Sequence, residues 1–493
     1  MNRSDPGSNS LPKQSDHSAD QPANLHVATS LESKKVGLPT PHAQEVNTGQ
    51  VSAEAHATVD HELADANVNA SPEGRPPSRP HFPSIRIPVK VHTFDSFRYR
   101  NYRLLWFTTF FSSAGFWLQQ IIIGWLTYDL TQSAFLTTVA MGLDALPVLL
   151  LGPLGGVLVD SWDRRKLLIF IYAYQGVITA IFGFVVIMGW LETWHIFAFI
   201  LVMGLAWVIS DPTRMSLIPN TVPKENLVNG FALNSMAFSV TRMAAPAIGG
   251  VLLAVSGPGP AILFQALLQA TAAVVAWFLV LPPSGDRTKL RVKSAFSNLV
   301  EGARYVTTQP VIMGVMLLGV LPPLLAFPFV NGLMPVFAAE VFDTGSVGLG
   351  LLMSSVGAGS VVGTLALASF GNVRYKGRLM IGAIAVTSIG MLGFSQVTSM
   401  GLAYPILMLL SVGMMTFFAT SSATVQSIVP DKFRGRVSSI YTMAFGTLPL
   451  GSLLAGALAS RLGAPTATLI AAILVAIVLG GFVLRSRTVW RYE

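Results

Sequence analysis

The chain has 493 residues, of which 52% are hydrophobic and only 11% are charged, and its formal net charge is +8. Soluble globular domains carry about 25% charged residues, so this composition excludes an ordinary soluble protein. The absence of cysteine excludes disulfide bonds, thiolate metal sites and cysteine nucleophiles.

Residues 1–92 differ in composition from the rest of the chain. Residues 1–85 hold six Lys or Arg and ten Asp or Glu, are rich in Ser, Asn, Ala and Pro, and have almost no aromatic residue before Phe82. Such a segment cannot bury enough apolar surface to offset its ordering entropy. Seven of the eight histidines lie in it at scattered spacings, so we expect no metal site there. We predict a disordered N-terminal tail over 1–92.

Twelve apolar runs follow the tail, each long enough to cross a bilayer as a helix of about 20 residues. They do not show the apolar-polar alternation of membrane β-strands. The runs lie near 103–127, 135–158, 167–190, 195–217, 230–255, 260–281, 310–339, 347–370, 377–397, 402–427, 438–460 and 465–484. We therefore predict an all-α membrane protein with twelve transmembrane helices.

The twelve runs divide into two sets of six around a basic linker at 282–308. VPKENLVNGFALNSMAF (222–238) aligns without a gap on VPDKFRGRVSSIYTMAF (429–445), which indicates duplication. Parallel six-helix halves are typical of transporters that rock around a central site. We predict an N-terminal half over 93–281 and a C-terminal half over 309–493 that ends in a short cytoplasmic tail.

Lys and Arg residues predict the orientation of the spans. With both termini in the cytoplasm, 24 of the 26 Lys and Arg residues after position 85 lie on the cytoplasmic side. Arg461 is the exception outside, and Arg242 falls within a span. This bias follows the positive-inside rule. The net positive charge therefore orients the chain in a lipid bilayer and needs no nucleic-acid partner.

Six segments resemble a known family. They are GWLTYDLTQSAF (124–135), LPVLLLGPLGGVLVDSWDRRKLL (146–168), DPTRMSLIPNTVP (211–223), ALNSMAFSVTRMAAPAIGG (232–250), EGARYV (301–306) and RGRVSSIY (434–441). Together they are similar to major facilitator superfamily transporters, from the branch that includes enterobactin exporters and macrolide efflux pumps. The resemblance covers about 95–488. It implies the major facilitator fold, a small-molecule substrate and a bacterial-type cell membrane.

The stretch GVLVDSWDRRKLLI (156–169) places five charges between two apolar runs. Its three cations satisfy the orientation rule, but that rule does not explain Asp160 at the end of an apolar helix. Asp211 and Arg214 are three residues apart and share a helix face, so both can cluster with Asp160. The resemblance assigns this loop to a cytoplasmic gate. The candidate gate residues are Gly156, Asp160, Arg164, Arg165, Lys166, Asp211 and Arg214; the alternative is that the cations only set topology.

Asp144 and Arg242 are charges placed deep inside predicted spans. Such charges are costly and normally face a cavity or a partner. Burial favours the protonated form of a carboxylate, whereas a nearby cation favours the ionised form. We therefore predict that Asp144 carries the coupling proton and that Arg242 takes part in coupling. The alternative is a static structural pair. The related branch commonly has Arg at the position of Arg242, whereas Asp144 matches no family signature.

APAIGG (245–250) resembles the end of the antiporter signature, with Pro246, Gly249 and Gly250 in matching places. Ala245 replaces the first glycine of that pattern, and ordinary helix packing is the alternative explanation. Some uncharged polar residues inside spans are candidates for a mainly apolar cavity that suits a bulky amphipathic substrate, although they could also only join helices. The candidates are Gln119, Gln120, Asn234 and Asn331.

Several chemistries lack their motifs in this sequence. No P-loop occurs, so the chain offers no ATP site, and His195 is the one histidine in the predicted membrane domain. We expect no enzyme, no cofactor and no metal site. The leading hypothesis is a monomeric secondary transporter that exports a drug-like, macrolide-like or siderophore-like molecule in exchange for protons by alternating access. An importer or facilitator of the same fold is second, and a lipid-translocating protein or intramembrane enzyme is third.

Overall fold

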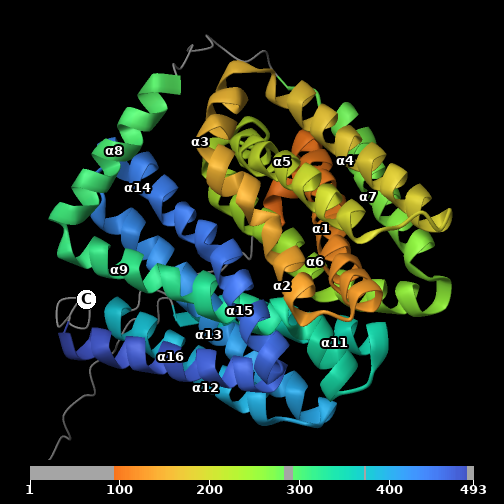
Figure 1. Cartoon of the computed structure of the whole chain (residues 1–493). Helices are drawn as coiled ribbons and strands as arrows, with labels where there is room; N and C mark the ends of the chain where they lie inside the picture. The colour runs from red at the N-terminus through yellow and green to blue at the C-terminus, as the bar shows by residue number, and fades with distance from the viewer. Residues whose placement is uncertain (1–93, 282–291, 371–373, 486–493) are drawn as a thin grey trace, which may run out of the picture. The chain divides into compact units, whose positions relative to one another are not determined.

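The computed structural model describes residues 94–281, 292–370 and 374–485, and every regular element in these ranges is a helix (Figure 1). The predicted tail over 1–92 lies outside the described residues. Eleven of the described helices are long and apolar enough to cross a membrane. The first predicted span, 103–127, corresponds to the 32-residue helix α1 (Arg100–Thr131), which is not among the eleven because polar residues such as Ser112 and Gln119 make it less apolar. The predicted fold class is confirmed.

The first six spans form one bundle. α1 packs along α6 and α7, α4 lies along α7, and α3 packs on α5 (Figure 1). The helices of this N-terminal half are α1, α2 (Ala134–Leu143), α3 (Ala145–Ser161), α4 (Arg164–Ile187), α5 (Thr193–Leu217), α6 (Leu227–Ser256) and α7 (Pro258–Trp277), with short turns η1 (Asp95–Arg98), η2 (Ile218–Asn220) and η3 (Lys224–Asn226).

The last six spans form the C-terminal half, in which α11 packs on α13 and α12 packs on both α13 and α16. Its elements are α9 (Pro310–Leu321), η4 (Pro322–Ala326), η5 (Pro328–Gly332), α10 (Met334–Val336), η6 (Phe337–Val341), α11 (Gly345–Phe370), α12 (Lys376–Gln396), α13 (Met400–Ile428), α14 (Asp431–Met443), η7 (Ala444–Thr447), α15 (Leu448–Leu462) and α16 (Ala464–Arg485). Between the halves, α8 (Val292–Thr308) covers most of the predicted linker.

The seventh span runs from α9 to η6 and is irregular. Pro322, Pro323, Pro328 and Pro335 fall inside it, and the elements η4, η5 and η6 are π-helical turns. Proline lacks an amide N–H and its ring clashes with the carbonyl four residues earlier, so a regular α-helix cannot continue through these positions. The wider π turns accommodate Pro322, Pro323 and Pro328, whereas Pro335 lies in the short helix α10.

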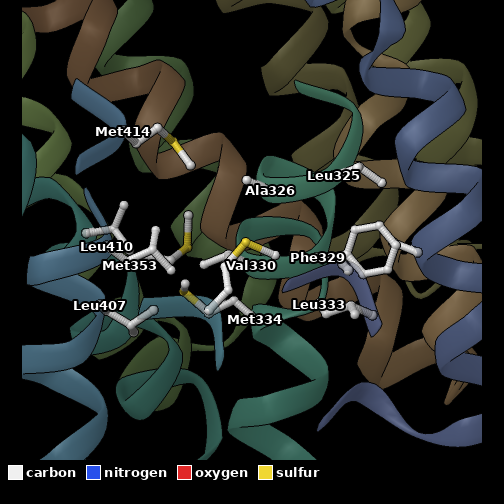
Figure 2. Close-up of a cluster of buried hydrophobic side chains, with 14 of the residues drawn as sticks. Leu325, Ala326, Phe329, Val330, Leu333, Met334, Met353, Leu407, Leu410 and Met414 are labelled. Atoms are coloured by element: carbon white, nitrogen blue, oxygen red, sulfur yellow. The ribbon is translucent and has the colours of Figure 1, made fainter. Parts of the chain in front are cut away.

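The interior of the C-terminal half is apolar. Figure 2 shows Val330 and Met334 of the seventh span facing Met353 of α11 and Met414 of α13, while Phe329 points to the other side. All five side chains are buried in one hydrophobic cluster. Flexible methionine side chains fill irregular gaps between helices, which suits packing against an irregular span.

The two halves meet mainly through α6 against α11 and α2 against α15. A Cβ atom built on Gly250 would lie 2.5 Å from the carbonyl oxygen of Ser346, and one built on Gly456 would lie 2.9 Å from the Cα of Phe135. Only glycine permits these approaches. We call the end of the bundle that carries Lys224 and Arg378 the basic end, and the other end the opposite end. Both contacts lie toward the opposite end.

At the basic end, the helix α8 docks on the C-terminal half. Glu301 of α8 forms an ion pair with Arg436 of α14, with 2.6 Å between Oε2 and Nη1. Tyr305 of α8 stacks on Phe433 of α14 at 4.6 Å between ring centroids. The described side-chain contacts of α8, at Glu301 and Tyr305, are therefore with the second half.

Candidate transport site

Asp144 lies at a break within the second span. It ends α2 and begins α3, and Pro147 three residues later lacks the N–H that a continuous helix would use. Its carboxylate Oδ2 accepts a hydrogen bond from the side-chain amide of Gln120 on α1, at 2.9 Å. Gly204 of α5 allows close packing here, because a Cβ atom at that position would lie 2.9 Å from the Asp144 carbonyl oxygen. The carboxylate is therefore held by a neutral donor within the bundle.

A cavity of about 50 Å³ lies inside the N-terminal half, and Asp144 is part of its wall. Its other walls come from α1, α4, α5, α6 and α7, and none of its lining residues belongs to the C-terminal half. Gln175 and Gln269 line it and are 8% and 2% exposed. The side-chain oxygens of both accept no hydrogen bond from the described residues. The cavity thus contains unpaired acceptors as well as a carboxylate.

The Asp211–Arg214 ion pair also lines this cavity, toward the basic end. Arg214 Nη2 donates to Asp211 Oδ1, and the side chains are 8% and 44% exposed respectively. The Arg214 side chain is therefore buried, whereas the Asp211 side chain is exposed. The predicted association of Asp211 with Arg214 is present. Gly156 and Asp160 lie in α3, in a stretch whose side chains are outside the described part of the chain, so the third member of the predicted cluster is not described.

The basic residues that begin α4 bind the ends of neighbouring helices. The Asp163 side chain accepts from the Lys166 backbone N–H at 3.0 Å and caps the N-terminus of α4. Arg164 donates to the Ser216 carbonyl at the end of α5 at 3.4 Å. Arg165 donates to the Trp277 carbonyl at the end of α7 at 2.5 Å. The cluster thus ties three helices together at the basic end.

Arg242 does not form an ion pair with Asp144 among the described residues. It is 7% exposed, its guanidinium carbon lies 5.0 Å from the centroid of the Trp117 ring, and Nη1 lies 3.8 Å from the Met415 sulfur. Met415 belongs to α13, so Arg242 contacts both halves. The two deep charges identified from the sequence therefore occupy different surroundings.

The glycines of the antiporter-like motif lie at helix contacts. A Cβ atom on Gly249 would lie 2.6 Å from Leu118 and Ile121 side-chain atoms of α1, and Gly250 faces α11. Ser346 of α11 donates to the Gly250 carbonyl at 3.1 Å. Pro246 is buried within α6. The motif thus packs one face of α6 on α1 and another on the second half.

The four predicted cavity residues differ in the contacts that they make. Gln119 lines the cavity and accepts from Gln265 at 3.0 Å. Asn234 is 4% exposed and accepts from Thr109 at 3.0 Å, which joins α6 to α1. The Asn331 side-chain nitrogen is buried and donates to no described residue. Of the four predicted residues, Gln120 has the most specific contact, because it binds the Asp144 carboxylate.

Comparison with known sequences decides the family. The sequence profile of the transmembrane secretion effector family matches residues 91–489. The chain belongs to this family. Its members are major facilitator superfamily transporters, so the chain is a multi-pass membrane transporter of that superfamily.

Curated relatives of this transporter are efflux proteins and a siderophore transporter. It is 24% identical over 377 residues to macrolide efflux protein A of Streptococcus pyogenes, covering 74% of this chain and 92% of that protein. It is 26% identical over 370 residues to the staphyloferrin A transporter of Staphylococcus aureus, covering 70% and 87%. It is 22% identical over 369 residues to the multidrug efflux pump Tap of Mycolicibacterium fortuitum, covering 73% and 89%. These relatives are transporters, not enzymes.

Solved structures of other transporters share the fold. The nucleoside transporter NupG gives a TM-score of 0.62 at 17% identity, covering 80% of this chain and 100% of that chain. A bacterial homolog of the human lysosomal transporter Spinster gives a TM-score of 0.63 at 12% identity, covering 79% and 97%. At this identity the likeness concerns the fold alone.

Sequence reasoning missed several residues of the transporter's interior. Tyr172 and Gln175 line the cavity from α4, and Trp117 forms the face that Arg242 covers. Tyr128 of α1 donates to Glu340 of the seventh span at 2.7 Å and joins the halves toward the opposite end. The available signal for Gln175 was an uncharged polar residue inside an apolar run. Nothing in the linear sequence distinguished Trp117 from the aromatic residues that only pack.

Proposed function

We propose that this transporter exports a small organic molecule in exchange for protons, by alternating access, with Asp144 as the proton carrier. The observation that carries the proposal is the cavity of the N-terminal half, with Asp144 in its wall and the Asp211–Arg214 pair toward the basic end. The efflux relatives support export as the direction. An intramembrane carboxylate that faces a polar cavity is a recurrent element of proton-coupled transporters.

Asp144 has surroundings that suit both of its protonation states. The ionised carboxylate accepts from the Gln120 amide at 2.9 Å, so it is not left without a partner. No described cation forms an ion pair with Asp144. In our proposal the proton binds to and leaves this carboxylate, and Gln120 is its hydrogen-bond partner in the ionised state.

The cavity supplies a path for that proton. A water molecule needs about 10–15 Å³ and two to four polar partners, so a cavity of about 50 Å³ holds roughly three waters. The unpaired oxygens of Gln175 and Gln269 are acceptors for such waters. A hydrogen-bonded chain across the cavity would connect Asp144 to the basic end without entering the space between the halves.

In our proposal, the predicted gate residues close the proton path at the basic end. Arg214 is buried by the fold, and its partner Asp211 is 44% exposed, so the pair can open toward solvent. Gly156 and Asp160 remain in the proposed gate with Arg164, Arg165 and Lys166, which follow in the same loop and helix start. The Lys and Arg bias supports a cytoplasmic basic end, both termini in the cytoplasm and a bacterial-type cell membrane.

Contacts between the halves support alternating access. Gly250 against Ser346, Gly456 against Phe135 and the Tyr128–Glu340 hydrogen bond all lie toward the opposite end. This arrangement supports a state closed on that side of the membrane. Rocking of one half on the other would break these contacts and form new ones at the basic end.

Replacing Asp144 by Asn tests the proposal. Purified protein in liposomes should move at least one of two labelled probes, a macrolide or a carboxylate siderophore, against its gradient when a proton gradient is imposed. Asp144→Asn should abolish this uphill movement while downhill exchange continues. Asp129→Asn is the matched control, because Asp129 is an exposed carboxylate toward the opposite end. A variant that still pumps uphill would remove Asp144 from the coupling mechanism. Wild-type protein that ignores the proton gradient would instead be a facilitator.

A further inference from the structure

Arg242 lies where the two halves of the transporter meet, about half-way along α6. Its guanidinium contacts Trp117 of α1 and Met415 of α13. Its backbone is close to α11, because a Cβ atom built on Gly357 would lie 2.6 Å from the Arg242 carbonyl oxygen. The middle of the membrane at the interface of two repeats is where transporters of this architecture place their substrates.

Within the described residues, the Arg242 cation has no strong hydrogen-bond acceptor. A guanidinium carries five N–H donors, and a thioether sulfur such as that of Met415 is only a weak acceptor. The Trp117 ring stabilises the cation through its face but accepts no directed hydrogen bond from it. A side chain that is 7% exposed cannot rely on bulk water for compensation. A buried charge without a counter-charge is normally matched by a partner or a ligand.

The Trp117 indole N–H beside Arg242 is also unpaired. This nitrogen is buried and donates to no described residue. Trp117 makes edge contacts with Phe116 at 5.1 Å and Phe238 at 5.6 Å between ring centroids, and Phe116 contacts Trp207 at 4.0 Å. Two sets of unsatisfied donors are therefore bordered by an aromatic surface. An acceptor attached to an apolar body would match these donors and this surface.

We propose that Arg242 and Trp117 form the recognition site for the anionic head group of an amphipathic substrate, a carboxylate in the simplest case. The carboxylate accepts from the guanidinium and the indole N–H, displaces the Met415 thioether, and leaves the apolar body on the aromatic side chains. A cationic amphiphile is disfavoured because its head group would meet a desolvated like charge. The inference rests on the proposed transport function and selects organic anions among its possible substrates.

The experiment compares two probes with one aromatic body and opposite head groups, pyrenebutyrate and pyrenebutylamine. Energy transfer from tryptophan to pyrene is titrated with the purified full-length chain in lipid nanodiscs, and the dissociation constant is taken from the midpoint. We expect the anion to bind about tenfold more tightly than the amine, since a charge-assisted hydrogen bond contributes that much. Arg242→Gln should weaken anion binding about tenfold, and Trp117→Phe about fivefold, with amine binding unchanged in Trp117→Phe.

Two further variants keep the test decisive. Arg242→Lys retains the charge and should recover part of the anion preference even where Arg242→Gln folds poorly. Arg461→Gln is the matched control, because Arg461 is an exposed arginine toward the opposite end, and it should change nothing. Equal affinity for the two probes in the wild type, or anion binding that survives Arg242→Gln unchanged, would overturn the proposal.

Failure of this proposal is distinguishable from failure of proton coupling. Binding is measured without a proton gradient, so the anion preference can be read whether or not Asp144 carries the coupling proton. Loss of the anion preference with intact coupling would refute the recognition site alone. An anion preference that persists while Asp144→Asn still pumps uphill would refute the proton carrier alone.

Discussion

The two halves of this transporter share an architecture but differ in where a buried carboxylate lines a cavity. In the N-terminal half, Asp144, Gln175 and Gln269 surround a cavity, and two of these side chains have unpaired oxygens. In the C-terminal half, Ser388 donates to the Ala472 carbonyl at 2.8 Å, and other hydroxyl groups bond to backbone in the same way. Asn331, Ser354 and Thr420 of the second half also carry buried polar atoms without a partner among the described residues. The cavity that has a carboxylate in its wall lies in the first half.

This difference has a physical reason. Placing an ionisable or unpaired polar group inside a membrane costs free energy, so such groups are found mainly where they serve a function. Hydroxyl groups that bond to the backbone of a neighbouring helix join helices without that cost. The cluster around the seventh span of the second half is lined by methionine, leucine and other apolar side chains (Figure 2). We infer that the first half handles protons and that the second acts mainly as its moving counterpart.

The largest effect on the transport rate is expected from removing the Asp211–Arg214 ion pair, and the Glu301–Arg436 pair provides the comparison. Arg214→Ala should lower the initial transport rate at least about tenfold, because a buried charged hydrogen bond at the end of the cavity is lost. Arg436→Ala removes the more exposed pair with Glu301 and should cost less than about threefold. Rates are normalised to the amount of protein in the membrane. Equal losses in both variants would break the functional asymmetry between the halves.

Blocking the cavity should have an intermediate effect. Gln175→Leu and Gln269→Leu each remove an unpaired acceptor and replace it with an apolar side chain of similar size, so proton-driven transport should fall about fivefold. Downhill exchange should be unchanged because the substrate route lies between the halves. Gln426→Leu on the exposed surface of α13 is the control and should transport normally. If coupling is insensitive to both cavity variants, the proposed proton path is wrong even where Asp144 is required.

The smallest expected effect concerns the contact between the halves. Tyr128→Phe removes the hydrogen bond to Glu340 and should shift the equilibrium between conformations by up to about fivefold, which corresponds to one hydrogen bond of about 1 kcal/mol. Because the chain has no natural cysteine, a single introduced cysteine at Thr138 can report accessibility from the opposite end. Faster labelling is expected in Tyr128→Phe. Unchanged labelling would mean that this bond does not hold the halves together.

The linear sequence determined the fold class, the duplication and the depth of the charges. Apolar runs of sufficient length can cross a membrane only as helices or barrel strands, and the absence of alternation left helices. The depth of Asp144 followed from counting residues within a run. These properties depend on composition and spacing along the chain, so they require no knowledge of which helices become neighbours.

Only the tertiary structure decided which polar groups share a space. Asn234 and Gln119 looked alike in the sequence, yet one joins α6 to α1 and the other lines the cavity. Asp144 and Arg242 looked like a pair, yet one binds Gln120 and the other covers Trp117. Each of these contacts depends on the rotation of a helix about its axis and on the choice of neighbour. Spans that are apolar on every side carry no periodic signal for that rotation, so packing alone determines it.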